Sequence, residues 1–243
     1  MTGTSGSNGN ADLTEEHDDD SREDNIEETS QGEESGKTAK KPSSSGAAQV
    51  AAEILAGEHP ATGIAEQNAL MMGESRSAST KAARVLAEIA TLRTDLVVPL
   101  IPDFAKGITS ANKRVVQTAA DALPQLARIQ PARVARQLPL LKGSYAETSE
   151  TGKDGIVRTF AALCTASVAY QKKLEPVLTT ALEEADGKTL LRWTKIVLPA
   201  LKGEPHANAR AVVERRMYQI PRATAQKIAE FLGVKLRHSY RGV

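Results

Sequence analysis

The sequence predicts an all-α fold made of helical hairpins that stack on one another. Apolar residues recur at spacings of three and four along most of the chain, which is the period of an amphipathic helix. Similar helix endings recur as LIPDFAKG at 100–107, LPLLKG at 138–143 and LPALKG at 198–203. Aromatic residues make up only 3% of the chain. An interior of alanine and leucine favours closely packed helices over a β-sandwich.

The first two expected helices lie at 47–57 and 60–73. Val50 and Ile54 lie on one face of the first, and Gly57 is expected to end it. We interpret these segments as a cap or an irregular first unit.

Clearer helical pairs follow, each a helix, a tight turn and a second helix. The interval from Gly107 to Gly143 is 36 residues, and that from Gly143 to Gly187 is 44. These intervals bracket the roughly 40 residues typical of two-helix repeats, in which hairpins stack because one alone cannot bury its apolar stripe. The predicted pairs are 79–92 with 96–107, 113–129 with 132–143, 154–170 with 174–187, and 188–203 with 209–220. The residues expected in the shared core include Val85, Leu123, Leu163 and Ile196.

Glycine closes each recurring ending, after a lysine in the last turn. Gly107, Gly143 and Gly203 are therefore predicted to adopt the left-handed conformation that often follows a helix, and the helix dipole favours the preceding lysine. At the start of the 79–92 helix, Ser79 or Thr80 is the expected N-cap.

Prolines lie inside several of these segments. Pro99 and Pro176 are expected in first turns, where proline costs little. Pro124, Pro139 and Pro199 are expected to kink or break their helices.

The hairpins at 83–107 and 115–143 combine an Ala/Leu/Val core with a proline-bearing second helix, and Asp95 lies in the first turn. In these features residues 78–218 resemble the HEAT-repeat family. The resemblance implies an α-solenoid of about four to five helical hairpins. It also implies a scaffold or binding surface, since such arrays are only occasionally enzymes. The segment 144–153 departs from the family pattern as an insertion.

Residues 1–46 form an acidic arm with twelve acidic and four basic residues, a net charge of −8. The rest of the chain has 27 basic and 18 acidic residues, a net charge of +9. The arm has too little apolar surface to offset its ordering entropy, so we expect it to be disordered. It is either a solubilising tail or an electrostatic competitor of an anionic partner. Measuring partner binding after deletion of 1–46 would separate these alternatives.

No sequence motif indicates an enzyme, and we expect no catalytic residue, cofactor or metal. The chain lacks the phosphate-loop, dinucleotide-binding, nucleophile-elbow and zinc-protease motifs. The single cysteine, Cys164, excludes an intrachain disulfide and is expected to be buried and inert. None of the histidines shows the spacing of a metal ligand set; they are His17, His59, His206 and His238.

One enzyme class remains as a third hypothesis, because some DNA-repair glycosylases resemble HEAT arrays. Such an enzyme would need an aromatic platform for a base, and Trp193 is the sole tryptophan. Leu190, Ile196 and Val197 lie three or four residues from it, which favours a core position instead.

Basic residues of the helical body are the candidates for contact with a macromolecule. Arg133, Arg136, Arg215 and Arg216 belong to second helices, whose equivalent positions line one surface in a stacked array. Residues 204–243 alone carry a net charge of +5. The candidates are Arg133, Arg136, Arg192, Lys195, Arg215, Arg216, Arg222, Lys227, Lys235 and Arg237, with Lys113 and Arg114 as further phosphate-contact candidates.

The C-terminal segment 223–243 resembles the first helix and turn of a helix-turn-helix motif, with Ala229 and Gly233 four residues apart. Ser239 then stands where an apolar residue should anchor a recognition helix. The alternative is a capping helix closed by Gly233 and followed by a basic tail.

The leading hypothesis is a non-enzymatic binding or scaffold protein that uses an α-solenoid surface to bind another protein. The alternative is a nucleic-acid-binding protein that uses the basic face and the C-terminal segment. The chain has no apolar run of about 18 residues and no signal-peptide pattern, so we expect no membrane partner and a cytoplasmic location. The expected organisation is an arm at 1–46, a helical repeat domain at 47–220, and a capping helix with a basic tail at 221–243.

Overall fold

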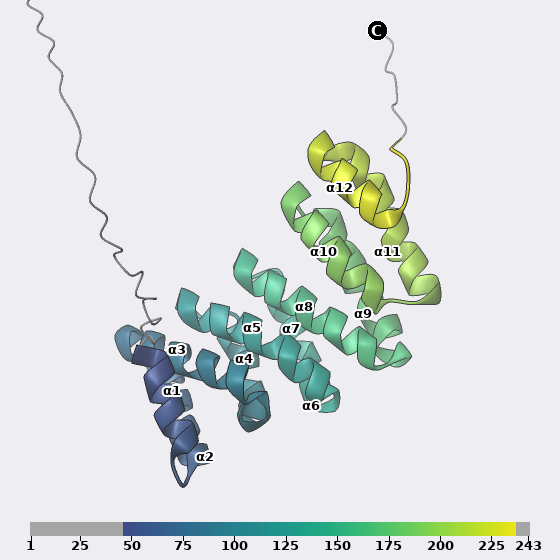
Figure 1. Ribbon diagram of the computed structural model, residues 1–243. Coiled ribbons are helices and arrows are strands. Elements are labelled where there is room, and N and C mark those ends of the chain that lie inside the picture. The colour runs from purple at the N-terminus through teal and green to yellow at the C-terminus, as the bar shows by residue number, and fades with distance from the viewer. Residues whose placement is uncertain (1–45, 237–243) are drawn as a thin grey trace, which may run out of the picture. The chain divides into compact units, whose positions relative to one another are not determined.

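The computed structural model describes residues 46–236 of the 243-residue chain, and this part consists of helices and loops without a strand. The predicted all-α class is therefore confirmed for these residues. Figure 1 shows the helices following one another in chain order. Their bounds are α1 (Gly46–Ala56), α2 (Pro60–Met72), α3 (Arg76–Leu92), the 3-10 helix η1 (Thr94–Leu100), α4 (Ile101–Gly107), α5 (Lys113–Ile129), α6 (Pro131–Ala135), α7 (Leu138–Ser144), α8 (Glu150–Ala166), α9 (Val168–Glu184), α10 (Gly187–Ala200), α11 (Gly203–Arg216), the 3-10 helix η2 (Met217–Gln219) and α12 (Arg222–Leu232).

Alternate helices form a row in which each helix contacts the next. α3 contacts α5, α5 contacts α8, α8 contacts α10, and α10 contacts α12. We call these helices the first-helix row. The segments that follow them, η1 with α4, α6 with α7, α9 and α11, are called the second-helix row. α1 and α2 both pack against α3.

The core runs continuously between these helices. Val85, Leu123 and Leu163 are buried, as predicted, and Ile196 is half-buried. Each fully buried leucine contributes about 1.5–3 kcal/mol relative to an exposed one. A close approach lies between α5 and α8, where a Cβ on Gly155 would lie 2.5 Å from the Cα of Ala120. Small residues therefore set the distance between these two helices.

Buried hydroxyl and amide groups join neighbouring helices through backbone carbonyls. Thr118 Oγ1 donates to the carbonyl of Ala83 at 2.9 Å, which connects α5 with α3. Gln171 Nε2 donates to the carbonyl of Cys164 at 2.9 Å, across the turn from α8 to α9. Because these buried groups are paired, they hold the helices in register without a desolvation penalty.

The predicted glycine endings are wrong at two of three positions. Gly107 is the last residue of α4 and Gly143 lies inside α7, and neither has a positive φ. The chain continues from each in right-handed conformation, at Ile108 and Tyr145, so no left-handed residue is needed. Gly203 does have a φ of 61°, but it begins α11.

Several predicted helix starts also lie elsewhere in the structure. α3 begins at Arg76 with Ser75 as its N-cap, so the predicted caps Ser79 and Thr80 lie inside the helix. α8 begins at Glu150, because Ser149 caps it, and the predicted insertion at 144–153 is therefore partly helical. α11 begins at Gly203 rather than at residue 209.

Some of the prolines occupy positions that differ from those expected. Pro139 lies in the first turn of α7, and the helix expected at 132–143 is divided just before it into α6 and α7, as predicted. Pro124 lies inside α5 without ending it, and Pro199 is the residue before the end of α10. Pro176 lies inside α9, because that helix begins at Val168, so its predicted place in a first turn is wrong. Pro99 lies in η1, which precedes α4.

The helix that ends the row is closed as predicted. Gly233, with a φ of 68°, follows α12 in left-handed conformation. The amide of Val234 donates to the carbonyl of Ala229 at 3.0 Å, and the amide of Gly233 donates to that of Glu230 at 3.2 Å. This is the geometry of a Schellman ending. The predictions for the arm at 1–45, and for Arg237 and the tail to residue 243, lie outside the described residues.

Among the described helices, none combines the length and the apolar composition that a bilayer span needs.

Candidate functional site

A chain of charged and polar side chains crosses α5, α8 and α10. Asp121 accepts hydrogen bonds from Gln117 Nε2 at 2.6 Å and from Arg158 Nη2 at 2.9 Å. Arg158 Nε in turn lies 2.8 Å from Asp154 Oδ2. Arg158 thus connects a carboxylate on its own helix with a carboxylate on the preceding helix of the first-helix row.

Asp154 carries this chain on to α10. Its Oδ1 lies 2.9 Å from Arg192 Nε and accepts a hydrogen bond from Trp193 Nε1 at 2.8 Å. The Asp154 side chain is only 16% exposed, and three donor groups surround it. Its charge is therefore well compensated despite the partial burial. We call the whole chain the polar ladder: Gln117, Asp121, Arg158, Asp154, Arg192 and Trp193.

The bonded pairs of the polar ladder that join neighbouring helices have similar separations in sequence. Asp121 and Arg158 are 37 residues apart, and Asp154 and Trp193 are 39 apart. Equivalent positions of successive first helices therefore lie side by side at intervals close to 38 residues. The glycine intervals of 36 and 44 residues missed this period because the glycines are not at equivalent positions.

A hollow of about 480 Å³ lies beside the polar ladder, toward the C-terminal ends of the same helices. Pro124, Ala161 and Pro199 occupy equivalent places in α5, α8 and α10 and line it, so much of its surface is apolar and small. Asp121 and Arg158 of the ladder form part of its wall. We call this hollow the proline groove, lined by Thr91, Asp121, Pro124, Gln125, Arg128, Arg158, Ala161, Ala162, Thr165, Ile196, Pro199 and Ala200.

A second hollow, of about 420 Å³, lies on the other side of Arg158, toward the N-terminal ends of α8 and α10. Its lining is polar and includes Asp186, the N-cap of α10. The carboxyl of Asp186 accepts a hydrogen bond from the Thr189 amide at 2.7 Å, and this bond is the main reason that the pKa of Asp186 is lowered.

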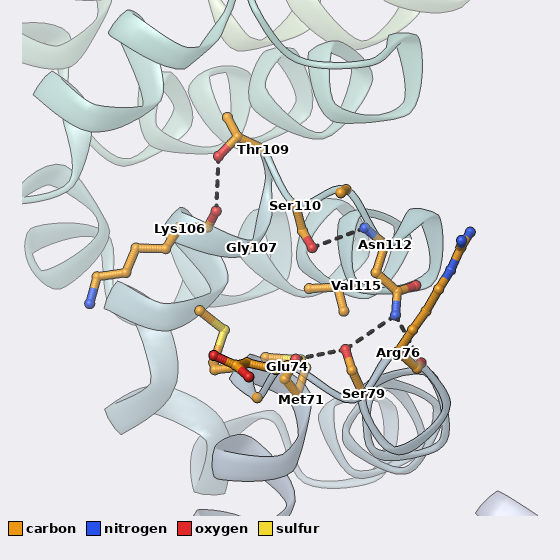
Figure 2. A pocket seen from close by; sticks show the side chains of 13 residues that line it. Met71, Glu74, Arg76, Ser79, Lys106, Gly107, Thr109, Ser110, Asn112 and Val115 are labelled. Atoms are coloured by element: carbon orange, nitrogen blue, oxygen red, sulfur yellow. Dashed lines mark hydrogen bonds between the residues drawn. The ribbon is translucent and has the colours of Figure 1, made fainter.

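A third hollow, of about 380 Å³, lies where α2 and α4 end and where α3 and α5 begin. Figure 2 shows that its polar side chains bond to one another. Asn112 Nδ2 donates to Ser79 Oγ at 3.1 Å, and Ser79 Oγ donates to the Met71 carbonyl at 2.8 Å. Lys106 lies 3.6 Å from Asp103. The bonds of Asn112 and Ser79 connect neighbouring helices, whereas the Lys106–Asp103 pair lies within α4.

Three of the candidate arginines already bind groups of the protein itself. Arg192 belongs to the polar ladder. Arg215 at the end of α11 pairs with Glu183 of α9. Arg216 Nη2 donates to the Ala185 carbonyl at 2.7 Å. Each of these contacts reduces what the guanidinium offers to an outside partner.

The other candidates are exposed, except for the half-buried Arg114, and they do not gather at one place. Arg133 and Arg136 line a hollow of about 180 Å³ with Pro99 and Pro102, at the start of the second segment of their pair. Arg215 and Arg216 stand at the opposite end of a second helix, so the structure does not bring these two pairs together. Lys195 is exposed on α10, Arg222 and Lys227 are exposed on α12, Lys235 follows Gly233, and Lys113 and Arg114 begin α5.

The residues of the proline groove were not among the predicted candidates. Thr91, Arg128 and Thr165 line the groove from the C-terminal ends of three successive first helices. They are separated by 37 residues each, so a search for this period in the sequence could have found them.

The two residues weighed for chemistry lie in the core. Trp193 is 2% exposed, as predicted, and its ring does not face solvent as a base-stacking platform would. Cys164 is buried, as predicted, and burial raises the pKa of its thiol to about 12. Within residues 46–236, no group of three or more histidine, cysteine, aspartate or glutamate side chains is placed to hold a metal ion.

Comparisons with known proteins show the fold alone. No protein-family model matches the chain, and no curated protein matches it. Among solved structures, the chain is similar to a crystal structure of an engineered protein, a Northeast Structural Genomics Consortium target. The TM-score is 0.53 at 19% sequence identity, over 79% of this chain and 91% of that one. The likeness supports the all-helical fold.

Proposed function

We propose that this chain is a non-enzymatic binding protein, an α-solenoid of HEAT-like helical hairpins that binds another protein. The observation that carries the proposal is the proline groove, which draws residues from α3, α5, α8 and α10 and combines apolar with polar side chains. Hollows lined by apolar residues with a few placed polar groups are the usual form of a binding site.

The proline groove is well suited to binding because its lining is already ordered. Proline and alanine side chains lose almost no conformational entropy on binding. Asp121 and Arg158 are held by the polar ladder, so these two charged groups of the wall are also fixed before a partner arrives. Preorganised groups lose little freedom on association, which leaves more of the contact energy for affinity.

The engagement of three predicted basic candidates within the protein weighs against a nucleic acid as the partner, whereas Arg128, Arg133, Arg136 and Lys172 remain exposed. A phosphate backbone requires several cations that face solvent along one track. Arg192, Arg215 and Arg216 are instead engaged with Asp154, Glu183 and the Ala185 carbonyl.

The test uses the full chain as bait and one variant that fills the groove. Thr165 is exposed in the groove, and its hydroxyl donates only to its own helix, at the Ala162 carbonyl. Thr180 on α9 is the matched control, because it is also exposed and donates to the Pro176 carbonyl of its own helix. Captured proteins are quantified by mass spectrometry with and without nuclease treatment.

We expect the same proteins on the wild-type chain and on Thr180→Trp, and their loss from Thr165→Trp, with no effect of nuclease. Capture that Thr165→Trp leaves intact, or that nuclease abolishes, would contradict the proposal. The nuclease result would then support the nucleic-acid alternative.

A further inference from the structure

We propose that the proline groove binds a peptide segment in which apolar side chains alternate with or precede carboxylates. This inference rests on the proposed function and names the chemical class of the partner. It is argued from apolar and basic side chains that lie next to the groove, at the turns between first and second helices.

Exposed apolar residues recur at three successive turns. Leu92 is 60% exposed, Ile129 is 46% exposed and Val168 is 60% exposed. Leu92 and Ile129 directly follow the groove residues Thr91 and Arg128 in the chain. Val168 begins α9 at the equivalent turn of the next pair. The turns that follow the groove residues therefore carry exposed apolar side chains of their own, and we call these turns the turn edge.

The cations at the turn edge are not neutralised. Arg128, Arg133, Arg136 and Lys172 are exposed. Among residues 46–236, no carboxylate forms an ion pair with any of these four side chains. The turn edge thus presents apolar surface together with positive charge that lacks a partner within the described chain.

A contrasting pair shows that the protein can neutralise charge at this edge. At the first turn, Arg93 and Asp95 form an ion pair with an N–O distance of 2.9 Å. The next turn has no such carboxylate; Arg128 precedes it, and Arg133 and Arg136 follow it, within nine residues of sequence. The unpaired charge is therefore concentrated at the α5–α6 turn.

These features fit one kind of partner. Apolar side chains entering the proline groove would bury surface at about 25 cal/mol per Å². Carboxylates that follow them would meet Arg128 at the groove and Arg133 or Arg136 beyond the turn, where guanidinium groups bind carboxylates through two parallel hydrogen bonds. A basic segment would be repelled by the same side chains, and nucleic acid would gain nothing from the apolar lining.

The experiment measures binding of labelled synthetic peptides to the full chain by fluorescence anisotropy at about 0.1 M salt. One short peptide combines leucine with glutamate. The second replaces each glutamate with lysine, and the third replaces each leucine with serine. An unlabelled DNA duplex is the competitor. We expect the leucine–glutamate peptide to bind at least about tenfold more tightly than either other peptide, and the duplex not to displace it.

Charge reversal on the protein provides the specific control. Arg128→Glu combined with Arg136→Glu should weaken the leucine–glutamate peptide about tenfold or more and strengthen the leucine–lysine peptide. Lys81→Glu combined with Lys188→Glu is the matched surface change, and it should leave both affinities unchanged. Both side chains are exposed near the starts of α3 and α10, at the opposite ends from the groove residues Thr91 and Pro199. Circular dichroism confirms that each variant retains its helices.

Equal binding of the first two peptides, displacement by duplex DNA, or no binding of any peptide would overturn the inference. The outcome is separable from that of the proposed function. If Thr165→Trp abolishes protein capture but the peptides show no charge preference, the groove binds a protein of another chemistry and only this inference fails.

Discussion

The two rows of helices differ in how proline affects them. In the first-helix row, α5 and α10 continue through or up to Pro124 and Pro199 as single helices. In the second-helix row, the segments after α3 and α5 are each divided into two short helices. Proline therefore lines the proline groove in the first-helix row and accompanies a change of helix in the segments after α3 and α5, whereas α9 continues through Pro176.

This difference explains where polar connections between helices are found. Long unbroken helices keep equivalent residues side by side, and the first-helix row accordingly carries the polar ladder. The second-helix row has Lys142 Nζ donating to the Lys173 carbonyl at 3.0 Å and the exposed ion pair between Glu183 and Arg215. The first-helix row thus carries a connected network, whereas these contacts of the second-helix row are separate from one another.

The largest expected effect comes from the closest helix contact of the first-helix row. Gly155→Ala would place a Cβ 2.5 Å from the Cα and Cβ of Ala120, so α5 and α8 must move apart. We expect the free energy of unfolding to fall by about 3 kcal/mol, at the upper end of overpacking costs. Urea denaturation followed by circular dichroism measures it.

Gly143→Ala is the control from the second-helix row. Gly143 lies inside α7 and is exposed, and a Cβ there would meet no heavy atom within 4 Å. This change should raise stability by about 0.5–1 kcal/mol. Equal effects of the two substitutions would contradict the close approach of α5 and α8.

The next effect comes from the centre of the polar ladder. Asp154→Ala leaves Arg158, Arg192 and Trp193 without their shared acceptor, and it should lower the free energy of unfolding by about 2 kcal/mol. Thermal and urea denaturation both check it. If Asp154→Asn, which keeps an acceptor oxygen, costs as much as Asp154→Ala, the hydrogen bond to Trp193 contributes nothing.

Much of the first-helix row could be predicted from the sequence, because amphipathic spacing alone places Val85, Leu123 and Leu163 in the core. The polar ladder could not. In the sequence, Asp121, Arg158 and Asp154 look like ordinary surface charges, because nothing shows that positions 37 residues apart lie side by side. The intervals of 36 and 44 residues between the glycines indicated other pairs of positions.

The second-helix row was less predictable. Pro176 was placed in a first turn because the preceding residues read as a break, yet Ser167 caps a helix that begins at Val168. A side-chain cap of this kind stabilises a helix start among polar residues that otherwise favour a break. The spacing of apolar residues alone does not decide whether such a segment is helical.

A smaller effect with a pH dependence is expected at the start of α10. Asp186→Ala removes the N-cap and should cost about 1 kcal/mol at neutral pH. Because the folded state lowers the pKa of Asp186, its contribution is complete above the ordinary aspartate value near 3.9 and is lost as pH falls through the lowered value.

The check for Asp186 is urea denaturation of wild type and Asp186→Ala across the acidic range. The difference between them should shrink as the pH is lowered. A difference that grows toward acid pH would show that the charged carboxylate does not stabilise the helix start.

The smallest effect is expected for the ion pair of the second-helix row. Glu183 and Arg215 have side chains 47% and 59% exposed, so solvent screens their attraction. Glu183→Ala should change the free energy of unfolding by about 0.5 kcal/mol or less. If Glu183→Ala lowered the free energy of unfolding as much as Asp154→Ala, the polar contacts of the two rows would not differ in strength.

The burial of Trp193 against Asp154 has a practical consequence. Trp193 is the one tryptophan in the whole chain, so the indole emission of the intact protein comes from a single, known position between α8 and α10. Its emission maximum and its quenching by added iodide would therefore follow the separation of these two helices, because no other residue contributes indole emission. A ligand that tightens or loosens the neighbouring groove could be detected without any attached dye.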